Sequence, residues 1–219
     1  MRWCAKKAIY PSADHWIRSN TARDIDLKFH SPGGALFAVE DFVPTLEKYV
    51  EKHQIGLNFF HTLVAVDSPG RKVWFDVSRP EIAVERIEVE FDMMHVTPPQ
   101  GAPDFIAVCP LADAVDRVNV DPSKLRHKIF DNTCSLGGMM NAIITKTAAA
   151  ARKQAPVVAD NTVTDMQDGT PIVQYDGYEA CPLTDARDKV ILAEFSYGGT
   201  LQASFPRWLI DDPKPRHLA

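Results

Sequence analysis

The sequence lacks most of the short motifs that would assign a function directly. None of its 11 glycines forms a G-x-G-x-x-G run, the strand-to-helix fingerprint that cradles a dinucleotide pyrophosphate. Its 4 cysteines form neither a C-x-x-C pair nor a zinc-finger spacing, so we expect no metal site. No apolar run reaches the roughly 18 to 20 residues that a membrane-spanning helix needs, and the amino terminus lacks the apolar core of a signal peptide. We therefore expect a protein of the cytoplasm or one peripheral at a membrane surface.

The chain also lacks an excess of basic residues. Its 24 Lys and Arg are outnumbered by 29 Asp and Glu, which gives a net charge of -5. A nucleic-acid-binding domain carries a basic face, and no cluster of Lys or Arg would create one here. Nucleic acid is thus excluded as a partner. With 45% hydrophobic residues in 219, the chain can bury an ordinary core.

The order of predicted elements indicates an α/β fold. Apolar residues recur at helical spacing over Phe42 to Val50, which predicts an amphipathic helix. Segments of β character flank that helix, and prolines make Met93 to Pro110 loop-like. A long helix is expected from about Gly137, interrupted or restarted at Pro156. The predicted strands are 24–30, 57–66, 72–77, 82–91, 174–178, 189–195 and 201–205.

Gly137 and Gly138 precede this predicted helix and allow two interpretations. Adjacent glycines let backbone N–H groups approach an anion at the positive end of a helix dipole. Taken alone, however, two glycines are more often a tight turn between a loop and a helix. The residues by themselves favour the turn.

Three segments occur together and in one order: LGGMMNAIITKTAAAARKQAPVV from Leu136, YDGYEACPL from Tyr175 and KVILAEFSY from Lys189. With CAKKAIYPSADHW from Cys4 and MHVTPPQ from Met94, they resemble the carboxyl half of the flavin-dependent sulfide:quinone oxidoreductases. The resemblance implies part of a tandem Rossmann-like FAD/NAD(P)-binding fold that lacks the first FAD-binding βαβ segment. Residues 1–110 would then be a portion of the second, substrate-side nucleotide-like domain. Residues 111–219 would be the returning FAD-domain portion, with a helix over 137–167 and terminal strands.

The resemblance also implies a redox site. Cys181 matches the family cysteine that attacks sulfide-derived sulfur beside the flavin, and Cys4 is its expected partner, although the loop after Cys4 is shorter than in the family. Sulfide would add to this pair, and FAD would pass the electrons to quinone. Lys146 is either an ordinary solvated helix lysine or a cation that stabilises a reduced flavin or quinone oxyanion. Cys109 and Cys134 match no catalytic cysteine, and we expect both to lie in packing.

The expected flavin contacts are incomplete. Gly137, Asn141, Lys146 and Thr147 match a family run that holds the flavin, whereas Gly138 stands where the family has the Asp that binds the ribityl chain. Thr97 and Pro98 lie in a loop that passes near the isoalloxazine and quinone in the family. His95 in that loop is suited to proton exchange, although a structural histidine is the more common outcome. Because glycine cannot accept the ribityl hydrogen bond, we expect this chain alone to hold FAD weakly or not at all.

Two classes of function therefore remain open. The first is an enzyme that oxidises sulfide and reduces quinone through FAD. The second is a truncated or diverged non-catalytic fragment, or a partner subunit of such a flavoprotein. Without the first FAD-binding segment, an apolar patch would be exposed, so we expect self-association or pairing with a complementary FAD-binding chain.

Overall fold

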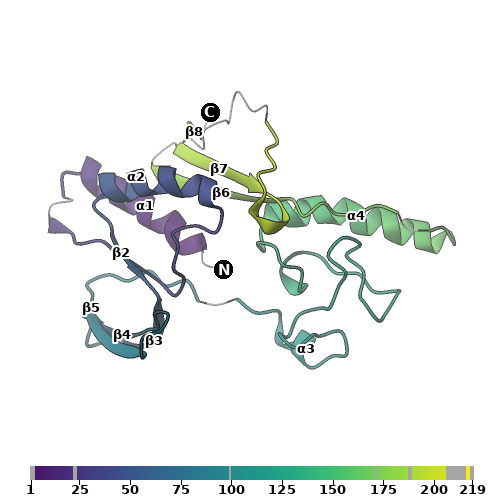
Figure 1. Cartoon of the computed structure of the whole chain (residues 1–219), viewed down its shortest axis with the longest axis horizontal. Coiled ribbons are helices and arrows are strands. Elements are labelled where there is room, and N and C mark those ends of the chain that lie inside the picture. Colours follow the sequence, from purple (N-terminus) through teal and green to yellow (C-terminus); the bar gives the residue numbers. More distant parts are fainter. Residues whose placement is uncertain are drawn as a thin grey trace. The chain divides into compact units, whose positions relative to one another are not determined.

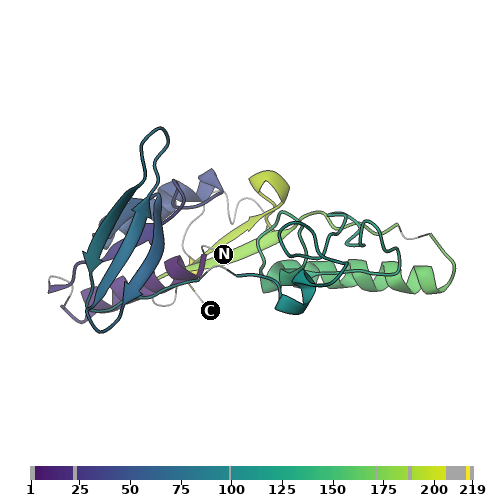
Figure 2. The ribbon, with the colours of Figure 1, turned by 90° about the horizontal axis from the view of Figure 1, so that it is seen from below.

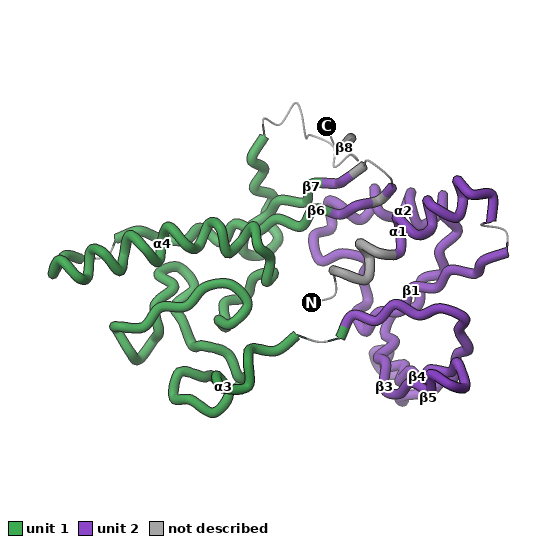
Figure 3. The backbone as a smooth tube through the Cα atoms, turned by 180° about the vertical axis from the view of Figure 1, so that it is seen from behind, with its two compact units in different colours: residues 1, 98–182, 192–212 green, residues 2–97, 183–191, 213–219 purple. Residues whose placement is uncertain are grey.

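The computed structural model describes residues 3–21, 24–98, 100–170, 172–186, 189–205 and 216–217. The side chains of residues 3–8, 185, 189, 216 and 217 lie outside this description. The chain divides into two compact units (Figure 3). Unit 1 comprises residues 1, 98–182 and 192–212, and unit 2 comprises residues 2–97, 183–191 and 213–219.

Unit 2 combines two helices with two small sheets (Figure 1). Strands β1 and β2 pair in parallel, and β3, β4 and β5 form an antiparallel meander, seen as a twisted sheet in Figure 2. The elements are α1 (Trp3–Arg18), β1 (Lys28–Ser31), α2 (Val43–Lys52), β2 (Gly56–Phe59), β3 (His61–Asp67), β4 (Lys72–Val77) and β5 (Glu85–Glu90).

The meander follows from the alternation of its central strand. Val73, Phe75 and Val77 of β4 are buried, because successive strand residues point to opposite faces. The opposite face carries ion pairs between β4 and β5, such as that of Lys72 with Glu88, 2.6 Å apart. The predicted strand 72–77 is confirmed. The predicted strand 57–66 is instead divided into β2 and β3 at Phe60, whose positive φ of 63° breaks the ladder.

The helix predicted over Phe42 to Val50 is confirmed as α2, which begins one residue later and ends at Lys52. Pro44 lies in its first turn, where a missing N–H costs nothing. Leu46 is fully buried and anchors the apolar face of the helix. The amino-terminal helix α1 was not anticipated from the sequence, and it continues through Pro11.

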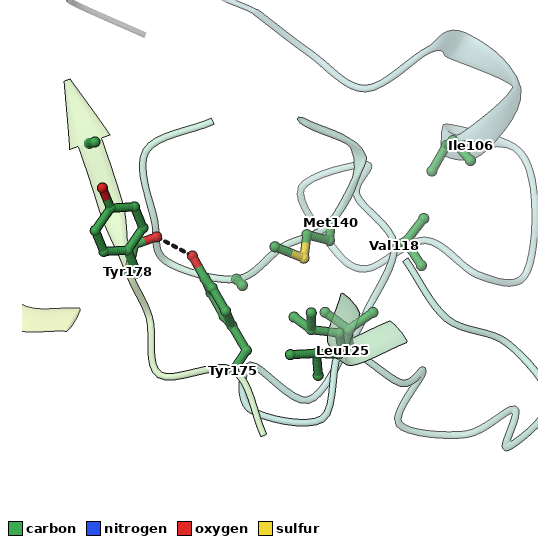
Figure 4. Close-up of a cluster of buried hydrophobic side chains, with 10 residues drawn as sticks. Ile106, Val118, Leu125, Met140, Tyr175 and Tyr178 are labelled. Atoms are coloured by element: carbon green, nitrogen blue, oxygen red, sulfur yellow. Dashed lines mark hydrogen bonds between the residues drawn. The ribbon is translucent and has the colours of Figure 1, made fainter. Parts of the chain in front are cut away.

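Unit 1 contains the helix α3 (Asp104–Ala107), a 3-10 turn at Gly137–Met139 and the helix α4 (Ala148–Met166). Strands β6 (Glu179–Ala186) and β7 (Lys189–Phe195) each have residues in both units, and β8 (Arg216–His217) pairs with β7. Figure 4 shows the core cluster of this unit. Its buried members are Ile106, Val118, Val120, Leu125, Met140, Ala142, Val157, Tyr175, Tyr178 and Ala180.

The prediction of a helix over 137–167 is wrong at its amino-terminal end. Gly137 has a φ of 70°, and Met140 is extended, so the chain cannot continue as a helix from the glycines. The long helix begins only at Ala148, where the Thr147 hydroxyl caps it by accepting a hydrogen bond from the Ala150 N–H at 3.2 Å. It continues through Pro156 without interruption. Among the described residues, no helix is both long and apolar enough to span a membrane.

The segment 174–178 was predicted as a strand, and this prediction is also wrong. Its backbone groups bond to a loop and to a side chain instead of a neighbouring strand, and Gly177 has a positive φ of 82°. The Tyr175 N–H donates to the Ser123 carbonyl at 2.8 Å, and the Tyr178 N–H donates to Oδ1 of Asp176 at 3.1 Å. The predicted strand 189–195 is confirmed as β7, whereas Leu201 forms only an isolated bridge with Phe195.

Gly177→Ala should destabilise unit 1. Gly177 has a φ of 82°, and an added Cβ would lie 2.3 Å from the Tyr197 ring. The backbone strain alone costs about 1 to 2 kcal/mol, and displacing the ring adds about 1 to 3 kcal/mol. The matched control is Gly138→Ala, because nothing lies within 4 Å of a Cβ there. Urea unfolding should show a large loss for Gly177→Ala and less than about 0.5 kcal/mol for the control; equal losses would contradict this packing.

Unit 2 should lose stability as pH falls from 7 towards 4. His30 and His61 bring their Nδ1 atoms to 3.1 Å, and the His30 ring stacks on Phe75. Burial, with the nearby His61 and Lys28, lowers the pKa of His30 from 6.5 to about 4. Because this pKa is lower in the folded chain, the unfolded chain binds more protons over that range, and acid favours unfolding.

A comparison of two variants isolates the contribution of His30 to the loss of stability in acid. In urea unfolding at pH 7 and pH 5, His30→Asn should show a smaller loss of stability on acidification than the unmodified chain. His95→Asn, at an exposed position, should show the same loss as the unmodified chain. An unchanged acid dependence in His30→Asn would contradict the assignment.

Candidate redox site

Strand β6 carries the cysteine that the sequence singled out. Cys181 is 1% exposed, and Glu179, two residues earlier, is 4% exposed. Residues two apart in a strand point to the same face, so both side chains lie on one side of β6. A buried carboxyl group is uncommon, because burial without hydrogen-bond partners is costly. The partners of Glu179 therefore identify what this face of β6 contacts.

Glu179 bonds to the segment that leads into α4. Its Oε2 atom accepts a hydrogen bond from the Thr145 N–H at 2.5 Å and a second from the Thr145 hydroxyl. The next residue, Lys146, donates from Nζ to the Ala142 carbonyl at 2.5 Å. Thr147 then caps the helix. The strand of Cys181 and the start of α4 are thus joined inside unit 1.

The charges at this junction perturb one another. Burial and, to a lesser extent, the like charge of Arg117 lower the pKa of Lys146 from 10.5 to about 8, and Glu179 partly opposes both. Burial raises the pKa of Glu179, whereas the hydrogen bonds from Thr145 and the charge of Lys146 act to lower this pKa and only partly offset the burial. Lys146 is therefore not an ordinary solvated lysine. An amine that changes charge close to physiological pH, near the strand that carries a buried cysteine, suits chemistry in which negative charge develops.

The glycine turn is held in place by two side chains that the sequence did not indicate. The Gly137 N–H donates to Oε1 of Gln154 at 2.8 Å, and the Gly138 carbonyl accepts a hydrogen bond from Arg117. Arg117 also donates to the Gln100 carbonyl at 2.7 Å, so it ties the turn to the beginning of unit 1. Gly137 and Gly138 are not the first residues of α4, which begins at Ala148, although a Cβ on Gly137 would lie 3.8 Å from the Cβ of Ala151 in that helix.

Asn141 supports the fold around the turn. Its Oδ1 atom accepts from the Val120 N–H, and its Nδ2 atom donates to Oδ1 of Asn119, both at 3.0 Å. Both polar atoms of the Asn141 side chain are thus bonded to other protein groups, and they hold two loop segments together. Thr147 likewise uses its hydroxyl as the helix cap.

The remaining predicted residues are placed only in part. Cys4 lies in α1, but its side chain is outside the described residues, so its pairing with Cys181 stays a prediction. Thr97 is the last residue before the boundary between the units, and Pro98 the first after it. The Thr97 hydroxyl is buried and has no hydrogen-bond partner in the part of the chain that the structure describes. Cys109, packed against the core of unit 1, and Cys134 carry free thiols and are partly exposed.

These residues fit one part of FAD better than the rest. The first turn of α4 has N–H groups without acceptors in the helix, and Lys146 lies beside it, which suits the electron-rich edge of an isoalloxazine ring. At Gly138 there is open space and no carboxylate for the ribityl chain, and no dinucleotide fingerprint occurs in the sequence. The chain thus offers groups for the ring and not for the pyrophosphate.

Arg117, Gln154 and Glu179 are the residues that sequence reasoning missed. Gln154 lies on the buried side of an alanine-rich helix, where its type gives no signal. Arg117 lies in an irregular loop, and its two carbonyl contacts depend on tertiary structure. Glu179 had a usable signal, because a charged residue next to apolar strand positions and close to a candidate cysteine is unusual.

Comparison with known proteins relates the chain to one family, although no family model matches it. The mitochondrial sulfide:quinone oxidoreductase of Dictyostelium discoideum is 37% identical over 88% of this chain, and 42% of that protein is covered. The mitochondrial sulfide:quinone oxidoreductase of Mus musculus is 30% identical over 92% of this chain, and 44% of it is covered.

Solved structures support the fold. A chain in the mitochondrial ATP synthase structure of Tetrahymena thermophila matches with a TM-score of 0.75 at 21% identity, over 88% of this chain and 47% of that one. The sulfide:quinone oxidoreductase of Aquifex aeolicus matches with a TM-score of 0.68 at 14% identity, over 85% of this chain and 46% of that one. The predicted α/β class, as part of the fold of FAD/NAD(P)-binding oxidoreductases, is confirmed. The resemblance drawn from the sequence is confirmed as well: along about nine-tenths of its length this chain is homologous to the sulfide:quinone oxidoreductases, and it spans less than half of theirs.

Proposed function

We propose that this chain carries the cysteine-bearing part of a flavin-dependent sulfide:quinone oxidoreductase. The homology over about nine-tenths of the chain to proteins of that name is the observation that carries the proposal. The arrangement around Cys181 supports it, because the buried thiol lies on the strand that Glu179 joins to Lys146 and the start of α4. These are groups that a sulfur-transfer reaction uses: a nucleophile, a cation and helix amides.

The chain's own residues would act at the sulfur atoms. Hydrosulfide attacks one sulfur of the disulfide formed by Cys181 and its partner, for which Cys4 is the candidate. The new S–S bond leaves a persulfide on Cys181, and the broken bond leaves the partner cysteine as a thiolate. Lys146 would stabilise negative charge that develops nearby, and the buried setting of Cys181 would exclude water. FAD, when bound, supplies the acceptor for the electron pair, and quinone is its final destination.

A second candidate function is a non-catalytic subunit that keeps the fold without the cofactor. The observation that favours it is Gly138, where the turn offers no carboxylate for a ribityl chain. A complementary FAD-binding chain would reconcile the two candidates, because it would supply the pyrophosphate site. Large exposed apolar side chains in unit 1 are consistent with such a partner or with self-association; they include Ile143, 92% exposed, and Val108, 87% exposed.

The isolated chain should retain far less than one FAD per molecule after gel filtration. The expected reason is the lack of pyrophosphate and ribityl contacts, since buried polar ligand atoms without partners weaken binding. Gly138→Asp should raise flavin retention, and Gly138→Ala, which adds volume without an acceptor, should not. Absorbance of the bound flavin at visible wavelengths measures both. Stoichiometric FAD on the unmodified chain, or equal retention by the two variants, would contradict this account.

Cys181→Ser should abolish sulfide-dependent quinone reduction in a reconstituted protein. The chain is co-expressed with the intact amino-terminal half of a related enzyme, and quinone reduction is followed on addition of sulfide. A hydroxyl cannot form the persulfide, so the loss should exceed about a hundredfold. Cys109→Ser and Cys134→Ser serve as matched controls and should retain activity. Full activity in Cys181→Ser would remove this residue from the mechanism, and a reconstituted flavoprotein without any sulfide oxidation would favour the non-catalytic subunit.

A further inference from the structure

Glu179 is the side chain through which β6 holds the segment before α4. Its Oε2 atom takes both the backbone N–H and the hydroxyl of Thr145. Two donors from one residue on one oxygen fix that residue in position and orientation, more firmly than a single contact would. The next residue along the chain is Lys146, so its backbone is fixed relative to β6 as well.

The same carboxyl group is an opposite charge near Lys146. Arg117 acts on Lys146 with a like charge, and Glu179 acts on it with an opposite charge. Glu179 is more deeply buried than either, at 4% exposure. In such surroundings charges interact more strongly than in water. Removing the charge of Glu179 would leave Lys146 with burial and Arg117 both acting against its ammonium form.

We propose that Glu179 is a positioning residue of the candidate redox site: through its two hydrogen bonds to Thr145 it holds the backbone of Lys146 against the strand of Cys181 and places a buried carboxylate near this lysine. The role of the lysine in sulfide oxidation rests on the proposed function, whereas the coupling of Glu179 to Lys146 is a property of the chain itself. Neither the family resemblance nor the sequence motif around Cys181 assigns a role to Glu179.

The consequence is that the charge of Lys146, near the strand of Cys181, depends on pH. With Glu179 ionised, Lys146 carries its charge up to about pH 8, where it titrates. Without that carboxylate the lysine would be neutral at lower pH, and the proposed reaction would lose the positive charge that Lys146 supplies. The site would then work only over a more acidic range.

The test is Glu179→Gln in the full chain without cofactor. Gln keeps an oxygen that accepts from Thr145, so the fold is retained while the charge is lost. Proton and carbon NMR of the lysine Cε, assigned with Lys146→Met, measures the pKa of Lys146. This pKa should fall by about one unit in Glu179→Gln. A value that is unchanged or higher would overturn the proposal.

Glu194→Gln is the matched control. Glu194 is a partly buried carboxylate of unit 1 that accepts hydrogen bonds from the Tyr178 hydroxyl at 2.5 Å and the Ser204 N–H at 2.8 Å. Its loss should leave the pKa of Lys146 unchanged; an equal fall in both variants would mean a general field effect and would overturn the specific link. If Glu179→Gln does not fold, Thr145→Val tests the same contact, because it removes the hydroxyl donor only. This variant should also lower the pKa of Lys146. Since no cofactor is present, the outcome stands whether or not the chain takes part in sulfide oxidation.

Discussion

The candidate site depends on one buried contact, the pair of hydrogen bonds from Thr145 to Glu179. This contact joins β6, which carries Cys181, to the segment that leads into α4. The same two segments also pack together in the core of unit 1, where Ala142 and Ala180 belong to one cluster of buried residues. The contact also brings the Glu179 carboxylate close to Lys146. The residue that holds the segment before α4 against β6 is therefore also the one whose charge acts on the lysine.

The glycine turn shows how tertiary structure revises a motif. Two glycines before a helix indicate an anion site at the helix dipole, but here the helix starts at Ala148 and the turn is a separate feature. The Gly137 N–H donates a hydrogen bond to the Gln154 side chain, and the Gly138 carbonyl accepts one from Arg117. The backbone groups that would have faced a cofactor are thus partly used within the protein. What remains for a flavin is the first turn of α4 and Lys146.

Local patterns predicted the elements that local forces determine. The strand 72–77 and the helix α2 have clear alternation or helical spacing, and both were found from the sequence. The errors occurred where distant groups decide the conformation. Residues 174–178 look like a strand, yet the Tyr175 N–H donates to the distant Ser123 carbonyl, and no pattern within the segment contains that information. Cys181 and Lys146 were found through the resemblance, whereas Glu179, which connects them, required the structure.

The central claim is that Cys181 carries sulfur during sulfide oxidation, and mass spectrometry tests it most directly. The chain, reconstituted with an FAD-binding amino-terminal half, is exposed to sulfide and blocked with an alkylating reagent before digestion. The account predicts that the peptide containing Cys181 gains the mass of one sulfur atom, while those containing Cys109 and Cys134 do not. Added sulfur on Cys109 or Cys134 alone, or on none of the three while sulfide is being oxidised, would contradict it.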